Sequence, residues 1–141
     1  MLTRFHVRNY ALLDEIAIDF RPGLNVLTGE TGAGKSILLG ALGLILGNRA
    51  TSDMIRTGAD TATIEALFDV AGSTINDRLP ADIECDEGTL IIRRDVSRDG
   101  RNRCTVNGNM VTVSALKQLG NSLVDLHGQH EHQSLLGQHT H

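Results

Sequence analysis

A glycine-rich loop that ends in lysine and serine is the segment best equipped for chemistry. Its pattern, Gly-x-x-x-x-Gly-Lys-Ser, occupies residues 29–36. Glycines let the backbone turn tightly and point its N–H groups inward, where they and the start of the following helix can cradle phosphate. In such a loop Lys35 reaches the β- and γ-phosphates, and the hydroxyl of Ser36 ligates Mg²⁺. The sequence therefore predicts a site for ATP with Mg²⁺, formed by Gly29, Glu30, Thr31, Gly32, Ala33, Gly34, Lys35, Ser36 and Ile37.

The segments on either side supply the setting that a phosphate loop needs. Residues 24–28 are a short apolar run that predicts a strand leading into the loop, and residues 37–46 predict a buried helix leaving it. Gly40 and Gly43 lower the helix propensity of the second segment, so we expect them to allow close packing against a sheet. Gly47-Asn48 is typical of a helix end. The result is a strand, a loop and a helix in the order that phosphate binding requires.

Most of the remaining chain follows strand and turn patterns. Alternation of apolar and polar residues predicts strands at residues 1–8, 13–20, 63–70, 90–96 and 103–106. The first two are expected to pair antiparallel across a turn that begins at Asn9 and Tyr10. Asp99-Gly100 and Asn107-Gly108 are strong hairpin signals, because both dipeptides tolerate positive φ. These patterns predict an antiparallel sheet.

A helix and a short strand are expected near the end of the chain. The helix begins at Thr112 or Val113 and runs through Asn121, with Ser114 close to its cap. Residues 123–126 are a short apolar run that predicts a buried strand. The fold class is therefore mixed α/β, a P-loop NTPase core with an antiparallel β-subdomain beside it.

Composition limits the class of protein. Apolar residues make up 40 % of the 141-residue chain, aromatic residues 3 %, and the formal net charge is −4. Nothing in these values indicates a generally basic nucleic-acid-binding protein. Cys85 and Cys104 lie far apart and outside any Cys-x-x-Cys pair, so neither a disulfide framework nor a zinc site is expected. With no signal peptide and no membrane-length apolar run, a soluble cytoplasmic protein is expected.

Two blocks of sequence carry a resemblance to a known family. The first combines Leu2-x-x-Phe5-x-Val7-Arg8-Asn9-Tyr10 with the segment from Gly23 through the phosphate loop. The second is Leu126-His127-Gly128-Gln129-His130-Glu131-His132-Gln133. Together they resemble the N-terminal head lobe of SMC-like ABC ATPases, and most closely the RecN family of DNA repair proteins. The resemblance runs from Met1 to about Leu136.

The resemblance implies a divided ATPase head. Residues 1–141 would form the N-terminal lobe, with the phosphate loop at 29–36 and a Q-loop at about 127–133. By resemblance Gln129 would contact Mg²⁺ and the attacking water, with Gln133 as the alternative. The coiled coil and the C-terminal lobe, with its signature motif and acidic pair, are absent. Asp86-Glu87 follows too weak a strand to replace that pair.

The same resemblance implies what the lobe does and with which partners. The intact protein would be an ATPase of double-strand-break repair and recombination, located in the bacterial cytoplasm at the nucleoid. Its partners would be the C-terminal head lobe, a second head across sandwiched ATP, and DNA, with no membrane. We expect the chain alone to bind ATP weakly, to hydrolyse little, and to expose apolar surface that promotes aggregation.

Several polar groups have both a functional and an ordinary interpretation. The spacing of His127, His130 and His132 is compatible with zinc, but no fourth ligand lies near and the Q-loop already accounts for the segment. A group of arginines surrounds the Asp99-Gly100 turn and could contact a DNA backbone or form a solvated hairpin face. That group consists of Arg93, Arg94, Arg98, Arg101 and Arg103.

Four further residues are tied to the nucleotide by resemblance alone. Arg49 or Arg56 would contact it, and Asn9 and Tyr10 would lie near the nucleoside.

Two other classes of protein remain open at this point. A self-contained small P-loop kinase would need its own acidic Mg²⁺ partner and an arginine-rich lid, and a non-catalytic nucleotide-binding subunit would need neither.

Overall fold

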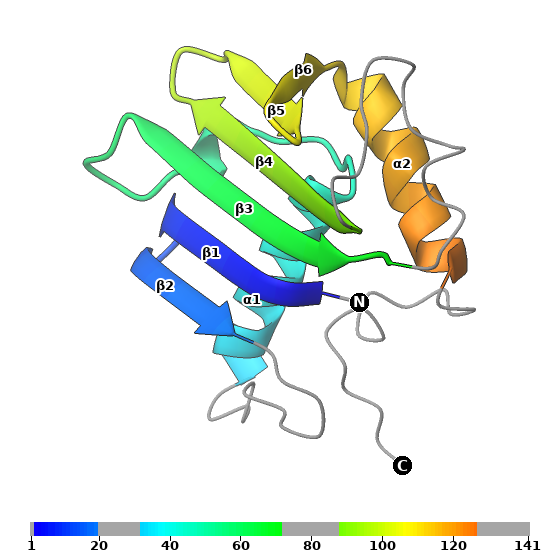
Figure 1. Ribbon diagram of the computed structural model, residues 1–141. Helices are drawn as coiled ribbons and strands as arrows, with labels where there is room; N and C mark the ends of the chain where they lie inside the picture. Colours follow the sequence, from blue (N-terminus) through cyan, green and yellow to red (C-terminus); the bar gives the residue numbers. More distant parts are fainter. Residues whose placement is uncertain (1, 20–31, 72–87, 127–141) are drawn as a thin grey trace.

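A six-stranded antiparallel sheet forms the centre of the fold, in the order β2-β1-β3-β4-β5-β6 (Figure 1). The structure, a computed structural model, describes residues 2–19, 32–71 and 88–126. The strands are β1 (Leu2–Tyr10), β2 (Leu13–Asp19), β3 (Thr61–Asp69), β4 (Thr89–Ser97), β5 (Asn102–Val106) and β6 (Asn109–Val111). The helices are α1 (Gly32–Ile45), the short 3₁₀ helix η1 (Ser52–Met54) and α2 (Val113–Leu126). The predicted strands at 1–8, 13–20, 63–70, 90–96 and 103–106 are confirmed to within a few residues.

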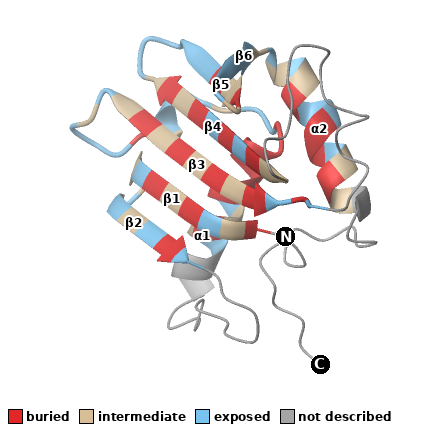
Figure 2. Cartoon of the chain, in the orientation of Figure 1, coloured by how far each residue is buried: buried red, intermediate tan, exposed pale blue. Residues whose placement is uncertain are grey.

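The alternation of β3 and β4 sorts their side chains between two faces. On β3, Ile64, Ala66 and Phe68 are buried, whereas Thr63 and Glu65 between them are only half-buried. Figure 2 shows this as bands of buried and partly exposed residues along each strand. Successive side chains of a strand point to opposite faces, so one face of the sheet supplies the core and the other meets solvent.

Both helices contribute to the core on the buried face. Helix α1 packs against β3 and β4 behind the sheet in the view of Figure 1. Helix α2 adds Leu116, Leu119 and Leu123, which repeat at the three- and four-residue spacing of one helix face. None of the helices in the described segments is long and apolar enough to cross a membrane.

The two predicted hairpin turns are confirmed. Gly100 has φ +93° in the connection between β4 and β5, and the backbone N–H of Ser97 donates to the carbonyl of Arg101. Asn107 and Gly108 have φ values of 50° and 84°, both in the left-handed region. Two successive positive φ angles are characteristic of a type I′ turn, whose twist matches that of the strands it joins.

One expectation for the end of the chain is wrong. Residues 123–126 belong to α2 rather than to a separate strand, because Leu123 continues the buried helical stripe of Leu116 and Leu119. The predicted start of the helix is confirmed, since α2 begins at Val113 and Ser114 lies close to the cap. The cap is Thr112, whose hydroxyl accepts a hydrogen bond from the backbone N–H of Ala115 at 3.0 Å.

Helix α1 agrees with the prediction at its C-terminal end and in part of its packing. It is followed by Gly47, with φ +99°, as expected. Gly40 faces β1, because a Cβ added there would lie 2.9 Å from the Tyr10 hydroxyl. Gly43 instead faces Asn48 of the next loop, with 2.6 Å between an added Cβ and the side-chain nitrogen, so its expected role in sheet packing is wrong.

Candidate nucleotide-binding site

The second half of the predicted phosphate loop forms the first turn of α1, which begins at Gly32. The first four N–H groups of an α-helix have no partner within the helix, and they lie at its positive end. The first turn of α1 contains no acidic side chain that would repel an anion, and Ser36 is exposed. The described backbone therefore presents amides suited to phosphate at the place where the motif predicts them.

Other parts of the predicted site fall outside the described residues. These are the strand at 24–28, the loop residues Gly29, Glu30 and Thr31, and the Q-loop candidates Gln129 and Gln133. The histidines His127, His130 and His132, the dipeptide Asp86-Glu87, and Cys85 also fall outside it. For residues 32–35 the helical backbone is described and the side chains, including that of Lys35, are not. Their roles remain predictions.

The turn after β1 holds Tyr10 against the middle of α1. Tyr10 is 7 % exposed, and its hydroxyl faces Gly40. Burial raises the pKa of the Tyr10 hydroxyl above its ordinary value, because the charged phenolate is disfavoured away from water. The neighbours Asn9 and Ala11 both have φ 54°, a region that non-glycine residues rarely adopt. A strained turn thus fixes the contact between β1 and the helix that carries the loop.

The two arginines tied to the nucleotide by resemblance have different surroundings. Arg56 forms an exposed ion pair with Asp14 at 3.8 Å, and its backbone N–H donates to the carbonyl of Asn9 at 2.8 Å. Arg49 is exposed, in the loop that follows α1. Of the two arginines, Arg56 is therefore the one whose backbone is hydrogen-bonded to the segment with Asn9 and Tyr10.

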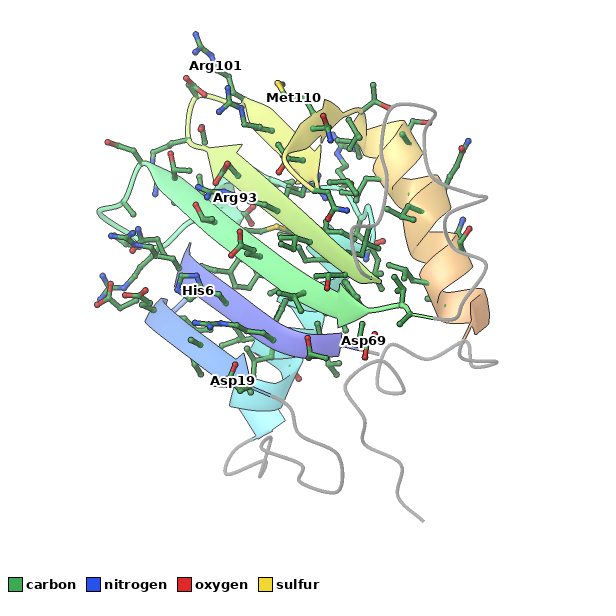
Figure 3. The ribbon with its side chains drawn as sticks, in the orientation of Figure 1. His6, Asp19, Asp69, Arg93, Arg101 and Met110 are labelled. Carbon is green, nitrogen blue, oxygen red and sulfur yellow. The ribbon has the colours of Figure 1, made fainter. Side chains whose placement is uncertain are left out.

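The five arginines near the first hairpin do not form one surface. Arg98 donates to the carbonyls of Ala59 and Arg56, at 3.0 and 3.2 Å. Arg101 is 88 % exposed at its side chain and pairs with Asp99 at 3.5 Å, and it extends from the hairpin in Figure 3. Arg94 points the opposite way, into the core. The interpretation of all five as a single cluster is wrong, because strand alternation turns Arg94 to the face opposite that of Arg93.

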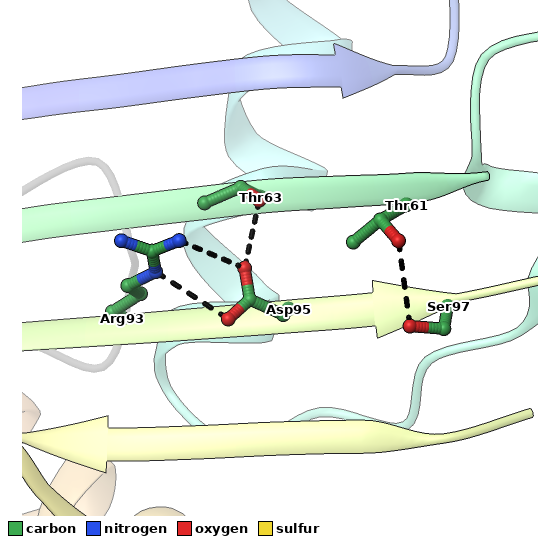
Figure 4. Close-up of polar contacts among 5 residues, drawn as sticks. All are labelled: Thr61, Thr63, Arg93, Asp95 and Ser97. Atoms are coloured by element: carbon green, nitrogen blue, oxygen red, sulfur yellow. Dashed lines mark hydrogen bonds and ion pairs between the residues drawn. The ribbon is translucent and has the colours of Figure 1, made fainter. Parts of the chain in front are cut away.

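Arg93 belongs to a polar row on the open face of the sheet (Figure 4). Its guanidinium lies 3.4 Å from the carboxylate of Asp95, which in turn accepts a 2.7 Å hydrogen bond from the Thr63 hydroxyl. A shallow depression of about 410 Å³ lies over this row. It is lined by Glu65, Ile91, Arg93, Asp95, Arg103, Thr105 and Gly108. Two arginines offset two carboxylates there, so the depression has no net charge to attract a polyanion.

The described residues offer no alternative centre for metal or thiol chemistry. No group of three or more His, Cys, Asp and Glu side chains within them could hold a metal ion. Cys104 is a buried free thiol, and burial raises its pKa above the ordinary value. A buried thiol with a raised pKa is a poor nucleophile. The start of α1 remains the candidate site.

Known structures define the class of this fold. A solved SMC ATPase, described under "Structural biochemistry of ATP-driven dimerization and DNA stimulated activation of SMC ATPases", superimposes with a TM-score of 0.67. It is 23 % identical in sequence, and the match covers 86 % of this chain and 78 % of that one. The fold is therefore that of an SMC-type ATPase head lobe, as predicted.

The sequence itself identifies the family. Residues 4–135 match the family model described as AAA domain, and the chain belongs to that family. It is similar to the DNA repair protein RecN of Halalkalibacterium halodurans, with 42 % identity over 148 aligned residues and 100 % of this chain covered. It is also 38 % identical to RecN of Bacillus subtilis strain 168, again with 100 % of this chain covered. The chain spans 25 % of the length of each of these relatives. The predicted likeness to RecN is confirmed.

One residue that bears on α1 was missed. Arg94 lies at the inward position of the series Leu90, Ile92, Arg94 and Val96, where the strand pattern expects an apolar side chain. The signal was present in the alternation itself, since a charged residue at an inward position of a strand calls for a buried partner. The arginine was instead grouped with its exposed neighbours along the sequence.

Proposed function

We propose that this chain binds ATP with Mg²⁺ as the N-terminal lobe of a divided, SMC-like ATPase head that acts in DNA double-strand-break repair. The observation that carries the proposal is the Gly-x-x-x-x-Gly-Lys-Ser pattern at 29–36, whose second half begins α1. The membership in the AAA domain family and the likeness to RecN support it.

The residues of the loop fit a magnesium-bound triphosphate in their chemistry. Backbone amides and one ammonium group, from Lys35, are donors for phosphate oxygens, and the Ser36 hydroxyl is a hard oxygen ligand for Mg²⁺. The absence of an acidic side chain from the first turn of α1 leaves the positive end of the helix uncompensated. ATP would supply the transferable γ-phosphoryl group, and Mg²⁺ would neutralise charge on its oxygens.

Each loop residue would have a separate task. Gly29, Gly32 and Gly34 would let the chain wrap the phosphates, while the amides of Glu30, Thr31, Ala33 and Ile37 would line the same nest. Lys35 would contact the β- and γ-phosphates. Gln129 would orient water and contact Mg²⁺, as its resemblance to the Q-loop suggests.

Hydrolysis would require partners that this chain does not carry. The AAA domain and the RecN likeness indicate an ATPase family. The sequence lacks a Leu-Ser-Gly-Gly run and an apolar strand ending in an acidic pair. We expect a C-terminal lobe and a second head to complete the site around ATP and to couple its closure to DNA. Binding of this kind stabilises the assembled state by mass action.

Calorimetry of the purified chain with MgATP tests the proposal. We expect one binding event, weakened by roughly tenfold or more in Lys35→Ala, because charge-assisted hydrogen bonds contribute about 1.5–3 kcal/mol each. The matched control is Lys117→Ala, which removes the chain's other lysine from an exposed position on α2. Wild-type protein that is folded and yields no heat with MgATP would contradict the proposal, and so would equal losses in the two variants.

A second assay separates binding from turnover. Co-expression with the downstream lobe of the same protein should give ATPase activity that the chain alone lacks, and Lys35→Ala should abolish it. Turnover by the isolated, monodisperse chain at the rate of the assembled head would show that no partner is needed.

A further inference from the structure

A single charged side chain lies in the core of the described residues. Arg94 on β4 is 1 % exposed, and no other charged residue is recorded as buried in the described segments. Its neighbours on the same face of the strand, Ile92 and Val96, are also buried. A charge in this position needs hydrogen-bond partners within the protein, because water does not reach it.

Arg94 has two carbonyl partners, one in the last turn of α1 and one in the loop that follows it. Its Nη1 donates to the carbonyl oxygen of Leu44 at 2.8 Å and to that of Asn48. Both bonds leave from one nitrogen, so the guanidinium joins the last turn of α1 to the loop that follows it. A cation at the negative end of a helix dipole is favourable, and the carbonyl of Leu44 accepts this bond in addition to one from the backbone N–H of Gly47 at 3.1 Å. Arg94 therefore ties β4 to the helix that begins with the phosphate loop.

A contribution to stability alone accounts poorly for this arginine. Its Nε is buried without a partner, and no carboxylate in the described part of the chain forms an ion pair with it. Burial lowers the pKa of Arg94, which is the direction expected for a cation removed from water. Well-packed apolar residues often stabilise a core as well as buried charges do, or better. What the arginine adds is a directed bond to a specific end of α1.

The end of α1 that Arg94 holds is also crowded by α2. A Cβ at Gly47 would lie 2.4 Å from the Cα of Lys117, and a Cβ at Gly120 would lie 2.3 Å from the carbonyl oxygen of Leu46. Backbone thus meets backbone on one side of the helix end, while Arg94 bonds to the same end from β4. This end of α1 is therefore held from two sides and can serve as the pivot of the helix.

The geometry of α1 makes its far end sensitive to that pivot. A helix of 14 residues is about 21 Å long at a rise of about 1.5 Å per residue. A tilt of about 3° around the anchored end would displace the first turn by about 1 Å, which exceeds the range of about 0.5 Å over which N–H···O hydrogen bonds keep good geometry. Small freedom at the C-terminal end would therefore disturb every amide that faces a phosphate.

We infer that Arg94 is a positioning residue for the phosphate loop, holding the C-terminal end of α1 so that the amides of its first turn meet the nucleotide. The inference rests on the proposed function, because it assigns to Arg94 an effect on the affinity for MgATP. Arg94 touches no nucleotide in this role and acts through the helix.

Calorimetry with MgATP on three variants tests the inference. Arg94→Met keeps a long apolar side chain without the two bonds, and we expect its folded form to bind about tenfold more weakly than wild type. Arg94→Lys should recover affinity to within about threefold, because an ammonium nitrogen carries three donors and can satisfy both carbonyls. The control is Val96→Ala, which leaves a cavity on the same face of β4, one inward position along, and should leave the affinity unchanged.

The comparison distinguishes positioning from general destabilisation. Urea unfolding of each variant gives the folded fraction, so that affinities are compared for folded protein only. Equal affinity of folded Arg94→Met and wild type would overturn the inference, and so would a matching loss in Val96→Ala. Absence of MgATP binding by wild-type protein would instead overturn the proposed function.

A measurement on wild-type protein covers the case in which Arg94→Met does not fold. If Arg94 raises the affinity for MgATP, MgATP must by thermodynamic reciprocity strengthen the hold of Arg94 on α1. We expect the exchange of its guanidinium protons with water, followed by NMR, to slow severalfold when MgATP is added. Exchange that stays the same at saturating MgATP would overturn the inference.

Discussion

Replacement of Gly120 by alanine should destabilise the fold, although the same change in an exposed helix stabilises it. Gly120 is buried in α2, where a Cβ would lie 2.3 Å from the carbonyl oxygen of Leu46 and 2.8 Å from its Cα. Both are backbone atoms, which cannot move aside as the end of a flexible side chain can. The two helices must therefore separate to admit a methyl group.

The size of the effect follows from two opposing contributions. The added carbon falls about 1 Å short of ordinary contact, and overpacking of this kind costs about 1–3 kcal/mol, with the upper end fitting a clash between backbones. Alanine in place of glycine returns about 1 kcal/mol of helix propensity. The net loss is about 2 kcal/mol, which corresponds to a fall of about 8 °C in Tm for a domain of this size.

Urea unfolding measures this loss directly. With an m-value of about 2 kcal/mol per molar, the midpoint should fall by about 1 M. Asn121→Ala is the matched control, because the adjacent residue is exposed on the same helix and should gain a few tenths of a kcal/mol by propensity alone. An unchanged or raised midpoint for Gly120→Ala would refute the close approach of α1 and α2 at this residue.

Three further outcomes are expected. The absorbance titration of Tyr10, the chain's single tyrosine, should have its midpoint above 10.0 in the folded protein and return to that value in denaturant. The part of the free energy of unfolding that is linked to this shift is fully present below pH 10 and is lost as the pH rises through the folded pKa. Cys104 should resist alkylation at pH 8 until the protein unfolds, since burial raises its pKa and shields its sulfur, and labelling of folded protein at the rate of a free thiol would contradict its placement. If the hairpin contacts a DNA backbone, Arg98→Glu together with Arg101→Glu should flatten the dependence of DNA binding on salt, and an unchanged slope would favour a solvated hairpin face.

The sheet could be predicted from the sequence because its signals are local. The period-two alternation of β3 and β4 shows directly which side chains face the core, and the dipeptides at Gly100 and Gly108 specify positive φ. Strand order beyond neighbouring hairpins had no comparable signal. The pairing of β1 with β3 joins residues about sixty positions apart, and it depends on the whole sheet rather than on any short segment.

The errors arose where a local pattern has two solutions. An apolar run of four residues at 123–126 fits the end of a helix as well as a short strand. The helix is observed because the buried stripe of α2 continues through Leu123, a fact that becomes visible only with the core. Arg94 was misjudged for a similar reason, since its chemistry favours solvent, and its burial is tolerable because it bonds to one carbonyl of α1 and one of the loop that follows.

The motif of the candidate site could be predicted from the sequence, whereas the tertiary contacts that hold α1 in place were harder to predict. The pattern at 29–36 predicts a phosphate loop without any structure, because each residue type in it has a defined task around phosphate. The contact of Tyr10 with Gly40 and the anchoring of α1 by Arg94 involve residues thirty to fifty positions apart. Such contacts depend on tertiary packing: the alternation of β4 places Arg94 at an inward position, but it does not identify the carbonyls that Arg94 contacts.

The most direct test of the central claim is an NMR titration of the isotopically labelled chain with MgATP. The backbone amides of Gly32 and Gly34, in the first turn of α1, should shift strongly as they bind phosphate, whereas those of Gly100 and Gly108 in the hairpins should stay in place. Shifts of the first pair that saturate with MgATP are the predicted result. A folded protein whose Gly32 and Gly34 signals do not move at millimolar MgATP would contradict the account.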